Sequence, residues 1–448
     1  MSKAYTLTPQ NVIGLLSFIG DVALSTALGP PPHGLDYNEA SASTWGLLLF
    51  QQLSRLNPDA ILGLMAKFRA DAFAGKVDLG VGVFRDLTGN TPILDCVRRA
   101  EQTVLASQST KSYVGAAGRE EFNSAVEELV LGPSHSARRE RRAGTVQAPG
   151  GCGALRVGAE LIRAAAPSAT VYVSDPTWGN HAPLLGSSGL PLERYPYYDA
   201  ATHELRFDAM LERLDRAAPG DVVLIHACCH NPSGADLGQA QWQTLIELLQ
   251  RRRLVPFLDL AYQGFGDDLT ADVAGVRLVA EKLPEVLIAT SYSKNLGLYR
   301  ERVGALIVVS ESESRAEAVR SHVLQIARGI YSMPPDHGAA IAACIFADSN
   351  LRESWIAELA GMRTRIKDMR ALLAKHLRMA TGDDSFDFIQ VQRGMFSLLG
   401  VSAAVVDRLR DQHHIYMTSD SRMNLAGIMP HNVAYVAQAI AAERTVPA

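Results

Sequence analysis

Two kinds of hydrophobic spacing alternate along the chain from about residue 50 onward. Apolar residues recur at helical spacing in the stretches 58–71, 94–107, 119–132 and 240–253. Short continuous apolar runs of strand length occupy 169–176, 221–232, 254–263, 285–294 and 302–310. Such runs indicate strands buried on both faces, and their alternation with helices is typical of a mostly parallel sheet covered by helices. We therefore predict an α/β fold.

Two further segments flank this pattern. Residues 76–86, "KVDLGVGVFRD", are predicted to form a strand that ends in a turn. Residues 351–377 have the apolar spacing of one long helix, and a smaller region of strands and helices follows to the C-terminus.

The N-terminal 50 residues have a different character. An apolar segment around residues 12–30 has the composition of a signal-peptide core or a membrane helix, but Asp21 interrupts it and only Lys3 precedes it as a positive side chain. We expect instead a short amphipathic helix that packs on the protein or on a partner subunit. The segment that starts at Gly29, rich in Pro, Gly and Ser, reads as a linker. Residues 1–50 are therefore expected to be an N-terminal extension.

Composition narrows the function classes. The chain has 448 residues, of which 47% are hydrophobic and 20% are charged, as in an ordinary soluble globular protein. Its formal net charge of −4 gives no basic surface that would indicate nucleic-acid binding. The five cysteines form neither a CxxC pair nor a zinc spacing, which predicts no metal site and favours reduced thiols in a cytoplasmic protein. They are Cys96, Cys152, Cys228, Cys229 and Cys344.

Polar side chains cluster where the predicted strands end. Trp178 and His181 follow one strand, Asn231 follows the next, and Asp259 ends a third with Tyr262 three residues later. Ligands bind beyond the carboxyl ends of strands in such sheets. Each residue alone has a structural alternative: Asp259 as a cap, His181 as a hydrogen-bonded buried histidine, Trp178 as part of the core. Their convergence at neighbouring strand ends indicates a site.

Lys294 occupies a confined setting in "SYSKNLGLYRERVG", residues 291–304, directly after an apolar run. A lysine held by a strand end and near positive neighbours loses its proton more readily than one in water. Lys294 is therefore a candidate nucleophile toward a carbonyl carbon. The alternative is an exposed loop lysine.

The order and spacing of several motifs resemble the aspartate aminotransferase branch of the fold-type I pyridoxal-phosphate aminotransferases. The similarity extends from about residue 57 to the C-terminus and does not cover the first 50 residues. The motifs are "LGVGVFRDLTG", "PGGCGALR", "HNPSG", "DLAYQGF", "SYSKNLGLYRERVG", "YSMPPDHGA" and "SRMNLAGI". The resemblance implies a homodimer, with a small α+β domain of residues 51–92 and 360–448 and a large cofactor-binding domain of residues 93–359.

The resemblance also implies a role for each strand-end residue toward pyridoxal 5'-phosphate. Lys294 would bond to the cofactor's aldehyde and then move a proton between the substrate and the cofactor. Asp259 would keep the ring nitrogen protonated, supported by His181. Tyr262 and Asn231 would donate to the phenolic oxygen. Trp178 would stack on the ring and, with Asn231, border the substrate.

The cofactor's phosphate requires donors that do not titrate. "PGGCGALR" reads as a glycine-rich turn that opens a helix, so that backbone N–H groups near Gly151 meet the anion. Cys152 stands where the family usually has a hydroxyl residue, and a thiol is a poorer donor. Cys152 is alternatively a core thiol.

Side chains from other segments would complete the phosphate site. In the resemblance, Ser291, Ser293 and Arg302 bind the phosphate, with Arg302 in a bidentate contact. Tyr113 would reach it from the neighbouring subunit.

The resemblance implies that two arginines bind the substrate. Arg422 matches the residue that binds the α-carboxylate, and Arg328 matches one that reaches across the dimer to a distal carboxylate; alternatively Arg328 is a solvated residue at a helix end. Met333 and Leu398 make the predicted pocket more apolar than is usual, which allows aromatic substrates. Residues that resemble the lid over the substrate are Ile61, Leu62, Val81, Gly82 and Phe396.

We therefore predict a cytoplasmic transaminase for L-aspartate, L-glutamate and aromatic amino acids, with 2-oxo acids such as 2-oxoglutarate as acceptors. One alternative is a specialised biosynthetic aminotransferase for a non-standard amino acid. Another is a non-catalytic protein that binds pyridoxal phosphate. The expected partners are these small molecules and a second copy of the chain, without nucleic acid or membrane.

Overall fold

The computed structural model describes residues 49–56 and 59–444. The chain divides into two units, residues 1–57 and 58–448, and every helix and strand below belongs to the second. In the first unit, a turn covers residues 49–52. The helix expected around residues 12–30 lies outside the described residues. None of the described helices combines the length and apolar character needed to span a membrane.

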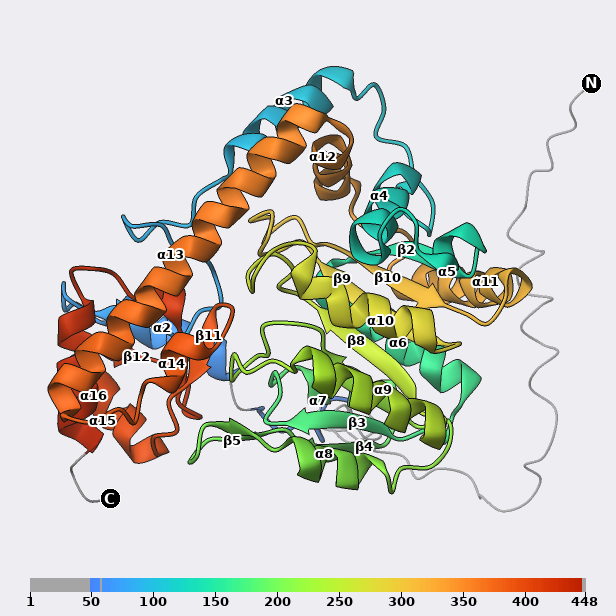
Figure 1. Ribbon diagram of the computed structural model, residues 1–448. Helices are drawn as coiled ribbons and strands as arrows, with labels where there is room; N and C mark the ends of the chain where they lie inside the picture. Colours follow the sequence, from blue (N-terminus) through green and yellow to red (C-terminus); the bar gives the residue numbers. More distant parts are fainter. Residues whose placement is uncertain (1–48, 57–58, 445–448) are drawn as a thin grey trace, which may run out of the picture. The chain divides into compact units, whose positions relative to one another are not determined.

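A seven-stranded sheet lies at the centre of the second unit (Figure 1). Its strand order is β2-β10-β9-β8-β7-β3-β4, and β10 runs antiparallel to both of its neighbours while the other pairs are parallel. The predicted mostly parallel sheet is therefore confirmed. The strands are β2 (Ala143–Pro149), β3 (Val171–Asp175), β4 (Leu192–Pro196), β7 (Val222–His226), β8 (Val255–Leu260), β9 (Val286–Ser291) and β10 (Val303–Val309).

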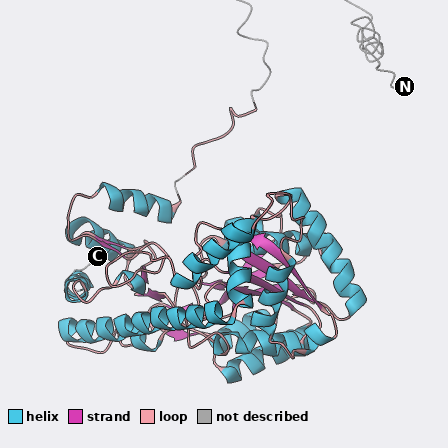
Figure 2. Ribbon diagram, turned by 90° about the horizontal axis from the view of Figure 1, so that it is seen from above, coloured by secondary structure: helices cyan, strands magenta, loops and turns pink. Residues whose placement is uncertain are grey.

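Helices bury both faces of this sheet, as Figure 2 shows. Successive side chains of β7 point to opposite sides, so that Val223 and Ile225 join one hydrophobic cluster and Leu224 joins the other. Helices α6 (Gly150–Ala165), α7 (His181–Gly186) and α11 (Glu313–Ile330) contribute to the cluster of Leu224. The cluster of Val223 receives α3 (Asp95–Ser107), α4 (Glu120–Leu131), α5 (Ser136–Arg139), α8 (Phe207–Leu214), α9 (Gln239–Arg252), α10 (Ala274–Lys282) and α12 (Asp336–Ala347).

A smaller α+β region combines segments from both ends of the second unit. Strand β1 (Val77–Asp78) pairs with β12 (Ile415–Tyr416) in parallel, and β11 (Phe396–Leu398) pairs with β13 (Arg422–Asn424) antiparallel. The long helix α13 (Ser349–Thr381) runs from beside α3 and α12 to this region (Figure 1). The remaining elements are α2 (Ala60–Ala70), α14 (Phe388–Val391), α15 (Ala403–His413), α16 (Val433–Arg444) and the short hairpin of β5 (Tyr198–Asp199) and β6 (Glu204–Leu205).

The strand predicted over residues 76–86 is wrong beyond its first residues. Only Val77 and Asp78 pair with a neighbouring strand, and residues 79–84 form an irregular loop. The Asp78 carboxylate accepts the backbone N–H groups of Gly80 and Val81, which directs the chain away from a sheet ladder.

Candidate active site

Most of the predicted site residues line one cavity of about 260 Å³ at the carboxyl ends of β7, β8 and β9. It is the edge at which an open α/β sheet presents its ligand-binding loops. The predicted residues that line it are Gly82, Gly151, Cys152, Trp178, Asn231, Asp259, Tyr262, Ser291, Ser293, Lys294, Arg302, Phe396 and Arg422, together with Ile61.

Lys294 lies just beyond the end of β9, half-buried in the wall of this cavity. Its ammonium nitrogen Nζ is 5.0 Å from the centroid of the Tyr262 ring. Burial lowers the pKa of Lys294, the nearby charge of Arg302 acts in the same direction, and Asp259 opposes them. The net shift favours a neutral amine, the form that attacks a carbonyl carbon.

A chain of buried polar groups leads from Asp259 away from the cavity. The Asp259 carboxylate at the end of β8 contacts His181 Nε2 at 3.0 Å. Thr177 Oγ1 then lies 2.8 Å from His181 Nδ1 and 3.2 Å from His226 Nε2. Burial raises the pKa of Asp259, but the hydrogen bond with His181 and neighbouring positive charge outweigh it and lower the net pKa. Asp259 is therefore an anion at neutral pH, suited to pair with a protonated ring nitrogen.

His226 is expected to stay neutral across physiological pH. Burial lowers its pKa to about 3, and His181 acts in the same direction. Because this folded-state pKa lies below the ordinary 6.5, the contribution of His226 to stability is full above pH 6.5 and is lost as the pH falls toward 3. In an NMR titration from pH 8 to pH 5, the imidazole signal that disappears in His226→Asn should not titrate. A midpoint near 6.5 would contradict this.

The start of α6 forms a cradle for an anion. Pro149 precedes the helix and no side chain of the described residues caps it, which leaves its first N–H groups suited to a ligand. Gly150 has φ +72°, and a Cβ there would lie 2.6 Å from Arg302 Nη2. At Gly151 a Cβ would lie 3.0 Å from that of Ser291. Only glycine leaves this space open, and a phosphate group fits its donors.

Hydroxyl and guanidinium groups face the same cradle. Arg302 Nη1 lies 3.4 Å from Ser293 Oγ, and the Ser291 and Ser293 hydroxyl oxygens are 3.3 Å apart. Cys152 is half-buried beside them, with its Sγ 3.9 Å from the amide nitrogen of Asn180.

Arg422 enters the cavity from β13 in the smaller region. Its Nη1 donates to Asn231 Oδ1 at 3.3 Å and its Nη2 to the Gly80 carbonyl at 2.9 Å. Its guanidinium carbon lies 4.5 Å from the centroid of the Phe396 ring. Within the described residues its buried Nε has no hydrogen-bond partner. A buried arginine with an unused donor is suited to bind a carboxylate.

Several predicted residues lie elsewhere. Tyr113 is 89% exposed, and Arg328 is exposed at the end of α11, where it contacts Ser332. Neither lines the cavity of its own chain. His181 lies behind Asp259, and the cavity lining also lacks Leu62, Val81, Met333 and Leu398.

The structure adds site residues that the sequence reasoning missed. Leu155, His226 and Tyr299 line the cavity, and Tyr299 accepts the backbone N–H of Phe84 at 2.8 Å through its hydroxyl oxygen. His226 is the polar residue at the end of the apolar run "VVLIH", and that position could have indicated it as a site residue. Tyr299 stands within the Lys294 motif, but only the fold shows that it faces the loop after β1.

A larger cavity of about 660 Å³ lies beside α9 and α14. Its two carboxylates already have partners: Asp236 accepts two backbone N–H groups and Asp272 accepts three. The smaller cavity, which contains Lys294 and the unused donor of Arg422, is therefore the candidate active site.

The fold and the cavity fit a fold-type I enzyme that uses pyridoxal 5'-phosphate. The model of a family described as aminotransferase class I and II matches residues 74–440, and the chain belongs to this family of transaminases. The chain is 45% identical over 383 residues to an aromatic-amino-acid aminotransferase of Paracoccus denitrificans, which covers 86% of this chain and 96% of the relative. It is 42% identical over 394 residues to an aspartate aminotransferase of Escherichia coli (strain K12). That match covers 88% of this chain and 100% of the relative.

A solved structure supports the same assignment. The crystal structure of an aromatic-amino-acid aminotransferase from Burkholderia pseudomallei, described as covalently bound to pyridoxal phosphate, superposes with a TM-score of 0.87 at 43% identity. The match covers 89% of this chain and 100% of that one.

Proposed function

We propose that the chain transfers amino groups from aspartate, glutamate and aromatic amino acids to 2-oxo acids such as 2-oxoglutarate. The observation that carries this proposal is a cavity with an amine-bearing residue, Lys294, and a buried arginine, Arg422, whose Nε lacks a hydrogen-bond partner in the described residues. An amino acid presents an amine and a carboxylate to such a pair. Relatives that carry the names of aromatic-amino-acid and aspartate aminotransferases support both substrate kinds.

When bound, pyridoxal phosphate supplies an aldehyde that reacts with amines and a ring that withdraws electrons from the attached carbon. Asp259 would pair with the ring nitrogen, and Trp178 would lie against the ring face. Tyr262 and Asn231 would donate hydrogen bonds to the ring oxygen. The α6 cradle with Ser291, Ser293 and Arg302 would bind the phosphate through N–H, hydroxyl and guanidinium donors.

Lys294 has two successive roles in this proposal. As a neutral amine it would hold the cofactor, and once the substrate's amine has taken its place it would be a free base within the cavity. From there it would move a proton between the substrate's alpha carbon and the cofactor. Burial lowers the pKa of Lys294, which favours the unprotonated amine that both roles require.

Arg422 would bind the substrate's α-carboxylate. Two of its nitrogens are already engaged by Asn231 and Gly80, which fixes the plane of the guanidinium. Phe396 against its face further limits its orientation. A carboxylate held in one orientation places the alpha carbon at a constant distance from Lys294.

Tyr113 and Arg328 would act in the site of a second copy of the chain. Both are exposed and absent from the cavity of their own chain. In a homodimer, Tyr113 of the partner subunit would contact the phosphate and Arg328 of the partner subunit would bind a distal carboxylate. We also propose a cytoplasmic location, because all five cysteines are free.

Arg328→Ala is expected to separate the two substrate classes. Turnover of aspartate and glutamate should fall by at least about 30-fold, because an unpaired charged group costs roughly 2–5 kcal/mol. Turnover of phenylalanine and tyrosine should change much less, since these substrates bring no second carboxylate. The measurement is kcat/KM of the donor half-reaction alone, from single turnovers of a panel of amino donors without 2-oxoglutarate, whose distal carboxylate would itself need Arg328. Arg320→Ala, an exposed arginine on the same helix, is the control. Equal losses for both donor classes would show that Arg328 is structural.

Two defective variants are expected to complement each other. A dimer of one Lys294→Ala protomer and one Arg328→Ala protomer has one site with both residues intact and one site with neither. If the protomers assort randomly on co-expression, half of the dimers are mixed, and glutamate turnover should reach about a quarter of the wild-type value. Activity no higher than that of the two separate variants would rule out a shared site.

A further inference from the structure

The loop of residues 79–84, here called the covering loop, follows β1 and borders the active-site cavity. Gly82 lines the cavity, and a Cβ at this position would lie 3.0 Å from Cζ of Phe396. The carbonyl of Gly80 accepts a hydrogen bond from Arg422 at 2.9 Å. The conformation of this loop therefore influences both the cavity wall and the arginine in it.

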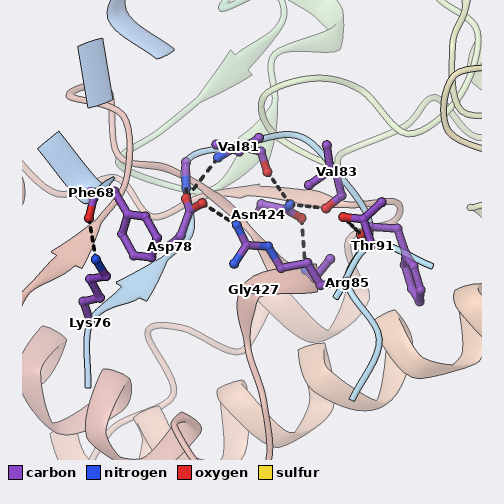
Figure 3. A network of polar contacts seen from close by, with 12 residues as sticks. Phe68, Lys76, Asp78, Val81, Val83, Arg85, Thr91, Asn424 and Gly427 are labelled. Atoms are coloured by element: carbon purple, nitrogen blue, oxygen red, sulfur yellow. Dashed lines mark hydrogen bonds and ion pairs between the residues drawn. The ribbon is translucent and has the colours of Figure 1, made fainter. Parts of the chain in front are cut away.

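Asp78 binds the first half of the covering loop, as Figure 3 shows. Its Oδ1 accepts the backbone N–H groups of Gly80 at 3.0 Å and Val81 at 3.3 Å. Its Oδ2 forms an ion pair with Arg85, which follows the loop. The Asp78 side chain is 6% exposed and that of Arg85 is 22% exposed, so water screens the pair less than it would at the surface.

Asn424 binds the same loop through the loop's carbonyl groups. Its amide nitrogen donates to the carbonyls of Val81 at 2.6 Å and Val83 at 2.8 Å (Figure 3). The backbone N–H of Asn424 donates to the Leu79 carbonyl at 2.7 Å. Asn424 thus engages carbonyl groups, whereas Asp78 engages N–H groups, and together they determine how the peptide units between residues 79 and 83 are turned.

We propose that Asp78 is a positioning residue for the substrate's α-carboxylate. By binding the N–H groups of Gly80 and Val81, Asp78 directs the Gly80 carbonyl toward Arg422 Nη2. That hydrogen bond restrains the guanidinium, which leaves its unused Nε available to the ligand. The ion pair with Arg85 holds the Asp78 side chain in place. This inference rests on the proposed role of Arg422.

The opposing interpretation is that the Asp78–Arg85 pair only stabilises the fold. The chain offers a matched pair for comparison: Arg408–Glu443 has side-chain exposures of 22% and 8%, and it joins α15 to α16 rather than to the covering loop. Glu443→Gln and Asp78→Asn each remove one buried carboxylate charge and retain the shape of the side chain. A stabilising role alone would give the two variants the same binding properties.

The test uses the holoenzyme and 3-phenylpropionate, a probe with a single carboxylate and therefore independent of Arg328. Its dissociation constant is measured by titration of the cofactor's absorbance, with the melting temperature recorded for each variant. Asp78→Ala should weaken binding about ten-fold, since it removes two hydrogen bonds and an ion pair from the loop. Asp78→Asn, which keeps the Oδ1 acceptor, should have a smaller effect. Glu443→Gln should bind the probe as the wild type does.

Three outcomes would overturn the inference. Wild-type affinity in both Asp78 variants would remove the positioning role, and so would equal weakening in Glu443→Gln. Arg422→Met serves to separate this inference from the proposed function. If Arg422→Met also binds the probe normally, the role of Arg422 itself is wrong. If Arg422→Met loses binding and the Asp78 variants retain it, only the positioning role fails.

Discussion

Lys294→Ala is expected to give a folded protein that has lost transamination by about 10⁴-fold or more. The variant lacks both the amine that would attach the cofactor and the base that would later move the substrate's proton. The loss should appear in single-turnover rates measured with glutamate and added cofactor, not only in the steady state. Cofactor binding should become weaker and fully reversible, because the variant has no amine to attach the cofactor. It should not be lost, because the contacts of the α6 cradle remain.

Lys282→Ala is the matched control for this prediction, since Lys282 is exposed at the end of α10. It should retain the wild-type single-turnover rate. A Lys294→Ala protein that keeps more than about a tenth of that rate would contradict the role assigned to Lys294.

Replacing Asp259 is expected to have the second largest effect. Asp259→Ala and the closer isostere Asp259→Asn both remove the carboxylate that would pair with the ring nitrogen. Breaking a buried charge pair typically costs about 3–5 kcal/mol, which corresponds to a loss of about 150- to 5,000-fold in the proton-transfer step. Cofactor attachment at Lys294 should persist, so the defect should lie in the rate and not in cofactor content.

Asp221→Asn provides the comparison for Asp259. Asp221 is also buried, but it precedes β7 at the other end of the strand and accepts the backbone N–H groups of Thr170 and Ala218. The Asp221→Asn substitution should lower the free energy of unfolding without a change in the single-turnover rate. A near-normal rate in Asp259→Asn would show that another group keeps the ring protonated.

The convergence of the strand-end residues could be predicted from the sequence because parallel strands impose it. Asp259 lies in β8, Asn231 follows β7 and Lys294 follows β9. A continuous apolar run followed by a polar residue was sufficient to place these groups at one edge. The glycine-rich turn before α6 could be predicted for a similar reason, since a helix start leaves N–H groups without partners.

The covering loop could not be predicted in the same way. Residues 79–84 have the alternating apolar pattern of a strand, yet side-chain hydrogen bonds from Asp78 and Asn424 replace the ladder that a strand would need. Asn424 is more than three hundred residues away along the chain. The local sequence pattern cannot indicate contacts between residues so far apart. These tertiary contacts determine that residues 79–84 form a loop and not a strand.

The placement of Tyr113 and Arg328 depends on a second copy of the chain. Their motifs suggested site residues, but each side chain is exposed in the single chain. No spacing rule distinguishes a residue that acts in its own site from one that acts in a neighbouring site. That distinction rests on the complementation experiment.

The location of the cofactor on the chain directly tests the role of Lys294. The holoenzyme is reduced with borohydride, digested, and its peptides are mapped by mass spectrometry. We expect a single modified peptide containing residues 291–304, with the cofactor on Lys294. Modification of any other lysine, or a holoenzyme whose cofactor remains unattached after reduction, would contradict the central claim.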